Sequence, residues 1–82
     1  CTETEWLSWL PGAVGRHALD IKPQQARVGD FLHLSWQALP PRTIALLSIA
    51  RLAVRFEFTG LTPIERQAFM KQFDLFMQRG GG

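Results

Sequence analysis

The sequence has little with which to cross-link itself, bind a metal ion or charge its surface. Its 82 residues include one cysteine, Cys1, so no disulfide can form within the chain, and a reducing compartment is the expectation. Cys1, His17 and His33 show none of the CxxC, HxxH or HExxH spacings of metal sites. Only 20% of the residues are charged, which is low for a small domain and indicates that a partner covers some apolar surface.

Motifs for catalysis and cofactor binding are also missing. Ser8, Ser35 and Ser48 lie in no nucleophile elbow, and the carboxylates are dispersed along the chain. The glycines in residues 12–15 lack the Gly-Lys-Ser/Thr ending of a phosphate loop, so a hinge is the preferred interpretation. We therefore expect no enzyme, no cofactor and no metal. An enzyme would need a deep pocket that holds a titratable group with a shifted pKa.

Long apolar runs are absent as well. No stretch reaches the roughly 18 apolar residues of a membrane-spanning helix, and no signal peptide is visible. The expectation is a bacterial cytoplasmic protein without membrane contact. Because the chain begins with Cys1, three explanations stay open: removal of a preceding Met, excision from a longer chain, or the lipidated Cys of a bacterial lipoprotein.

Apolar and aromatic residues are what the chain does have. A hydrophobic fraction of 46%, with three Trp and six Phe, predicts a folded core. The net charge is +2, and the Lys and Arg residues are scattered, unlike the clusters of a dedicated nucleic-acid domain. The length predicts one domain over residues 1–82, of modest stability, with fraying at residues 1–2 and 80–82.

The most regular pattern is the alternation in residues 52–58. The apolar set is Leu52, Val54, Phe56 and Phe58, and the other set is Ala53, Arg55 and Glu57. Because successive side chains of a strand point to opposite faces, this alternation predicts a half-buried antiparallel strand.

A helix is predicted to follow at residues 63–79. Thr62 can cap its first turn, Pro63 fits the first helical position, and Glu65 can bond back to the Thr62 amide. The main apolar stripe is Phe69, Phe73 and Phe76, flanked by Met70 and Met77. We predict that this stripe packs on the apolar face of residues 52–58. A second, smaller stripe is Ile64, Ala68 and Leu75, and it needs the N-terminal segment or a second subunit as its partner.

Earlier segments give weaker signals. Thr2 and Glu5 form a possible capping box for a short helix that contains Trp6 and Trp9, which Pro11-Gly12 is expected to close. The tryptophans are interpreted as anchors onto the core, with a ligand platform as the alternative. Strands are predicted at residues 15–22 and 31–39, joined by a connection over residues 24–30, and Pro40-Pro41 is expected to end the second.

Residues 43–49 are apolar but out of phase with residues 52–58. One interpretation is a strand that breaks, by a turn or bulge, near residues 48–51. A helical turn through residues 45–50 is the competing interpretation, and the periodicity does not decide between them.

Residues 28–34, 52–56 and 61–65 resemble the later strands and closing helix of PilZ domains. Members of that family bind cyclic di-GMP through an Arg-rich segment and an Asp/Asn-x-Ser-x-x-Gly turn, neither of which stands in this sequence. The resemblance therefore implies no binding residue here. At most it implies a ligand-free relative that binds a partner.

Together the patterns predict a small α+β domain in the order α-β-β-β-β-α. A small antiparallel sheet of three to four strands carries a short N-terminal helix near one end and a long C-terminal helix on one face.

The favoured function is a non-enzymatic protein-interaction module that forms a homodimer, because the last helix is two-sided and the surface charge is low. The candidate interaction surface comprises His33, Arg51, Arg55, Ile64, Ala68 and Leu75. The alternative is a nucleic-acid or nucleotide binder that uses the polar sheet face around Arg55. That face resembles the platform of single-strand RNA binders in outline, without their two stacking aromatics.

Overall fold

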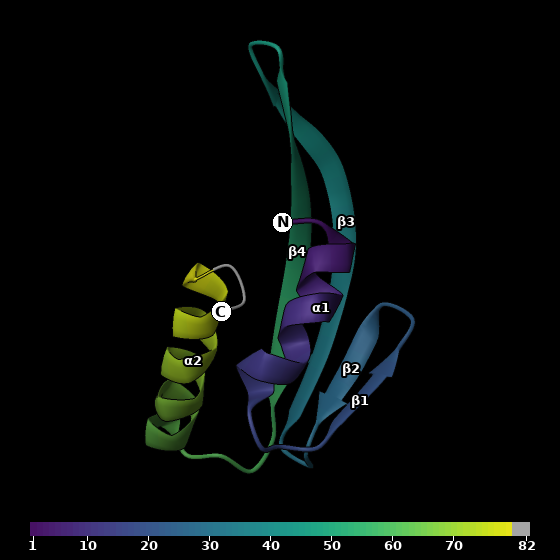
Figure 1. Ribbon diagram of the computed structural model, residues 1–82. Helices are drawn as coiled ribbons and strands as arrows, with labels where there is room; N and C mark the ends of the chain where they lie inside the picture. Colours follow the sequence, from purple (N-terminus) through teal and green to yellow (C-terminus); the bar gives the residue numbers. More distant parts are fainter. Residues whose placement is uncertain (80–82) are drawn as a thin grey trace.

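The structure, a computed structural model, confirms the α+β class and describes residues 1–79, with Ile49 described by its backbone alone. The predicted fraying of residues 80–82 lies outside the described residues. The elements are α1 (Glu3–Val14), β1 (Leu19–Lys22), β2 (Gln25–Val28), β3 (Leu32–Ile44), β4 (Leu47–Phe58) and α2 (Pro63–Gln78). The strands form one antiparallel sheet in the order β1-β2-β3-β4 (Figure 1).

Both helices cover the same face of the sheet and contact each other. The buried residues of this face are Ala26, Val28, Leu32, Leu34 and Trp36. Phe73 of α2 contacts Phe56 of β4, with ring centroids 5.3 Å apart, and Phe69 contacts Phe58 at 6.0 Å. The predicted packing of the last helix on the strand is therefore found for these two rings. The ring of Phe76 lies instead against Gly12 of α1, where a Cβ atom would overlap it.

The N-terminal helix is longer than the sequence predicts. Its capping box is present: the Thr2 hydroxyl accepts from the Glu5 amide, and the Glu5 carboxylate accepts from the Thr2 amide. The prediction that Pro11-Gly12 closes this helix is wrong, because α1 continues through Pro11 to Val14. Pro11 has no N–H group and cannot donate a backbone hydrogen bond within the helix. The residues of the next turn, Ala13 and Val14, are buried, and this burial offsets the missing bond. Trp6 is an anchor, 4% exposed and T-shaped to Trp36.

The predicted connection over residues 24–30 is wrong, since residues 25–28 are strand β2. Ala26 and Val28 are buried under α1, and their short alternation with polar residues is weak evidence on sequence alone. The turn between β1 and β2 puts Pro23 before Gln24, which has a positive φ of 60°. The first strand begins at Leu19 and not at residue 15.

Strands β3 and β4 form one long hairpin whose far half projects beyond both helices (Figure 1). We call residues 39–51 the hairpin arm. The prediction that Pro40-Pro41 ends the strand is wrong, because β3 bulges there: Leu39 faces Arg51, whereas Arg42 faces Ile49. Since proline cannot donate to the ladder, a bulge is where a strand tolerates it. The break predicted near residues 48–51 is wrong, because β4 runs through these residues without interruption and the chain turns at Ala45 and Leu46. The helical turn through residues 45–50 is also wrong, since Ala45 and Leu46 make a hairpin turn.

The last helix agrees closely with its local signals. Thr62 is the N-cap, Pro63 begins the helix, and the reciprocal capping bonds with Glu65 are 3.2 and 2.9 Å long. The helix ends at Gln78, with Arg79 as the C-cap residue. A capping box of this kind can be recognised from neighbouring residues alone, because it requires no tertiary contact.

Candidate interaction surfaces

The structure separates the six residues of the candidate interaction surface into two groups. His33, Arg51 and Arg55 lie on β3 and β4 at odd positions, opposite to even positions that are buried on β3 and half-buried on β4. The other three, Ile64, Ala68 and Leu75, lie on α2 and are exposed on the helix side of the sheet. The six residues therefore belong to two surfaces, one on each side of the molecule.

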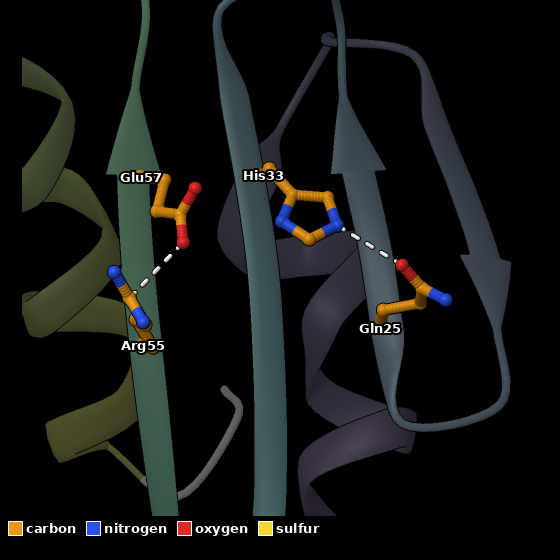
Figure 2. A network of polar contacts seen from close by, with 4 residues as sticks. All are labelled: Gln25, His33, Arg55 and Glu57. Atoms are coloured by element: carbon orange, nitrogen blue, oxygen red, sulfur yellow. Dashed lines mark hydrogen bonds and ion pairs between the residues drawn. The ribbon is translucent and has the colours of Figure 1, made fainter.

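The open sheet face is polar and carries two local contacts (Figure 2). His33 Nε2 lies 3.1 Å from Gln25 Oε1, and Arg55 Nε lies 3.0 Å from Glu57 Oε1. Such an exposed ion pair contributes about 0–1 kcal/mol. By register, the charged residues of this face are Asp20, Lys22, Arg27, Arg42, Arg51, Arg55 and Glu57. The aromatic residues of the described strands, Trp36, Phe56 and Phe58, all occupy the opposite face.

An apolar groove separates the end of α1 from the second stripe of α2. Its volume is about 960 Å³, and its apolar lining includes Val14, Phe69 and Leu75. Arg16, Glu65 and Arg79 also line it. Ala68 and Leu75 thus face the N-terminal segment without being covered by it, and Ile64 remains 78% exposed.

The carboxylates with shifted pKa values belong to the two capping boxes. Hydrogen bonds from the Thr62 amide and then from its hydroxyl lower the pKa of Glu65, and Thr2 lowers the pKa of Glu5 in the same way. Both side chains are exposed and their partners are fixed by helix capping. These shifts have a structural cause in the helix starts. Within residues 1–79, no three His, Cys, Asp or Glu side chains gather as a metal-ligand set.

The hairpin arm carries an apolar end that the sequence analysis did not identify. Ile44, Leu46 and Leu47 are 50%, 100% and 69% exposed around the turn. Its signal in the sequence is the mostly apolar run of residues 43–50, which contains no charged residue. Half of the large hydrophobic side chains exposed in the described chain, three of six, lie at this one end.

Among residues 1–79, no strand pairs with the outer edge of β4, which is therefore the long free edge of the sheet. The Thr59 amide donates to the Phe31 carbonyl at 2.8 Å, and this pair continues the register in which Leu32 faces Phe58. Hydrogen-bonded pairs alternate with pairs that are not hydrogen-bonded in an antiparallel ladder. The odd residues of β4 up to Arg51 therefore bond to β3. The even residues, including Leu52, Val54 and Phe56, direct their N–H and C=O groups away from the sheet.

Comparison with known proteins leaves the assignment to the structure itself. No family model, curated protein or solved structure matches the chain. The PilZ resemblance of the sequence thus gains no support. None of the helices in the described part of the chain is long and apolar enough to cross a membrane.

Proposed function

We propose that this chain is a non-enzymatic protein-interaction module whose partner is a second copy of itself. The observation that supports the proposal is the apolar end of the hairpin arm. Leu46 is fully exposed there, and its neighbours Ile44 and Leu47 are at least half exposed. Exposed apolar side chains gathered at one place mark interaction sites more often than isolated ones do. The proposal includes a bacterial cytoplasmic location, with which the single free cysteine agrees.

A second copy suits this surface because the arm lies beside a free strand edge. Isologous contacts between two copies are the commonest form of protein oligomer. Burial of a leucine side chain stabilises an interface by about 1.5–3 kcal/mol. The arm of each copy can contribute such side chains without any change in its own fold, since they are already half or more exposed in the single chain.

Sedimentation equilibrium of the native chain and of Leu46→Ser tests the proposal. We expect the native chain to dimerise at micromolar concentration and the dissociation constant of Leu46→Ser to rise at least about tenfold. The unfolding free energy of the monomer should change by no more than about 0.5 kcal/mol, because the side chain is fully exposed. Ile21→Ser, on β1, is the matched control: Ile21 is 44% exposed and outside the candidate surfaces, so this variant should leave association unchanged. A native chain that stays monomeric at high micromolar concentration would refute self-association.

The open sheet face favours a second candidate, a nucleic-acid binder. Its five basic residues outnumber Asp20 and Glu57; they are Lys22, Arg27, Arg42, Arg51 and Arg55. Phosphate contacts by such residues give salt-dependent affinity, although the described strands place no Trp or Phe on this face for stacking. Arg55→Glu should then abolish a mobility shift with single-stranded oligonucleotides that Arg66→Glu, on α2, retains. The absence of any shift at low salt would exclude this function.

A further inference from the structure

The two edges of the sheet differ in how well they are protected against pairing. β1 has four residues and is followed by Pro23, whereas β4 has twelve residues without a proline. Natural edge strands are usually short, bulged, covered or interrupted by proline and charge. The bulge of this hairpin lies on β3, so β4 is regular along its whole outer edge. An edge of this kind is a template for another strand.

We infer that two copies of the chain pair β4 with β4, antiparallel, about a two-fold axis at Val54, which joins their sheets into one. This inference rests on the proposed self-association and names the surface that performs it. The outward N–H and C=O groups of Val54 would bond to the same groups of the second copy. Leu52 of each copy would face Phe56 of the other on the helix-covered side.

The charges on β4 select this register. Because both copies have helices on the same side, residues that face each other must be both odd or both even. An axis at Arg51, Arg55 or Glu57 would set each of these residues against its own copy. An axis at Ala53 would set Arg51 against Arg55. Only repulsion is gained in these registers, since like charges directly opposite destabilise a strand pair.

The axis at Val54 has the opposite effect. It places Arg51 of each copy opposite Glu57 of the other, so two attractive pairs flank the axis. An axis at Leu52 leaves every charge without a charged partner. An axis at Phe56 sets Arg55 opposite Glu57 but overlaps only residues 54–58. The Val54 register combines the longer overlap with charge complementarity.

The same register also accounts for the apolar arm. It carries Leu46 and Leu47 of one copy past the end of the other copy's β4, toward Leu61, before α2, and Ile64 in its first turn. Ile64 is 78% exposed in the single chain. A single interface between two copies would thus include the apolar end of the arm, the predicted interaction residue Ile64 and the free edge of β4.

Charge reversal tests the register. Glu57→Arg sets Arg51 against a second cation twice in each dimer, and we expect the dissociation constant to rise about tenfold or more. The double variant Arg51→Glu with Glu57→Arg restores the pairs and should return within about threefold of the native value. Asp20→Arg changes the net charge equally, on β1 of the same face, and should dimerise as the native chain does. Failure of the double variant to recover would overturn the Val54 register.

Amide hydrogen exchange separates this inference from self-association as such. The amides of Ala53 and Arg55 bond to β3 and should be protected at every concentration. Those of Leu52, Val54 and Phe56 should exchange freely in the monomer and become protected as the dimer fills. A dimer in which these three amides still exchange freely overturns the inference and leaves the proposed function standing. A chain that never dimerises overturns both.

Discussion

Phe73 is the residue that contacts both helices and the sheet. Its ring is 2% exposed, lies 5.8 Å from Trp6 of α1 and 5.3 Å from Phe56 of β4, and borders Phe69 on its own helix. Aromatic pairs with these separations contribute about 0.5–1.5 kcal/mol beyond the area they bury. The sequence identified Phe73 as the middle of the main stripe, because helical periodicity alone places it there.

Glu65 shows how a residue at the surface makes stability depend on pH. Its folded-state pKa lies below the ordinary value of 4.5, first because of the Thr62 amide and second because of the Thr62 hydroxyl. A lowered folded pKa adds stability above the unfolded pKa, and that stability is lost as the pH falls through the folded value. We expect the native chain to unfold at higher urea concentration than Glu65→Gln at about pH 7. The two chains should converge at about pH 3.

Urea unfolding curves at a series of pH values measure this convergence. Glu5 has the same cap geometry and the same direction of shift, so Glu5→Gln should behave alike. Combining both substitutions should reduce further the loss of unfolding free energy between about pH 7 and pH 3. An unchanged difference between native chain and Glu65→Gln across the acid range would show that the capping bond does not lower this pKa.

Two turns hold non-glycine residues in the left-handed region, and these limit the stability of the hairpins. Gln24 has φ 60° and Ala45 has φ 54°. A side chain in this conformation is strained, and glycine relieves the strain. We expect Gln24→Gly to raise the free energy of unfolding by about 0.5–1 kcal/mol, measured by urea unfolding.

Lys22→Gly is the control for the same turn, since Lys22 is an exposed strand residue without a positive φ. It should lower the stability by about 0.5–1 kcal/mol, because glycine loses more backbone freedom on folding. If Gln24→Gly also lowered the stability, the turn between β1 and β2 would not contain the positive φ.

Elements with local signals could be predicted from the sequence, and elements defined by their partners could not. The helix α2 is written in Thr62, Pro63 and Glu65, so its start was predicted to the residue. The strand β2 forms because Ala26 and Val28 are buried in the core beneath α1. The helix α1 continues beyond Pro11 because Ala13 and Val14 are buried in the same core. Neither cause is visible in a window of neighbouring residues.

The candidate surfaces show the same division. Alternation correctly placed His33 and Arg55 on the open face of the sheet, because strand periodicity is a local property. The groove beside Leu75 and the free edge at Val54 depend on which elements are neighbours. The direction of the edge groups follows from the bond between Thr59 and Phe31, which only the folded chain reveals.

At the scale of the whole molecule, the arrangement of helices explains why one edge is left open. Both helices cover one face of the sheet. The hairpin arm extends the molecule to 44 Å in its longest direction, compared with 25 and 21 Å in the other two. Small domains bury a limited share of their surface, so contacts with a second copy add a large fraction to a modest stability. The stability of this chain should therefore depend on its own concentration.

Thermal unfolding over a range of protein concentrations measures that dependence. A tenfold rise in concentration stabilises each chain of a populated dimer by about 0.7 kcal/mol, half of the roughly 1.4 kcal/mol per tenfold step. For a domain of this size, that corresponds to an increase in Tm of about 3–5 °C. Glu57→Arg should show this rise in Tm only at about tenfold higher concentration, whereas Asp20→Arg should follow the native chain. A native Tm that stays constant where sedimentation detects the dimer would mean that the contact between copies adds nothing to the folded state.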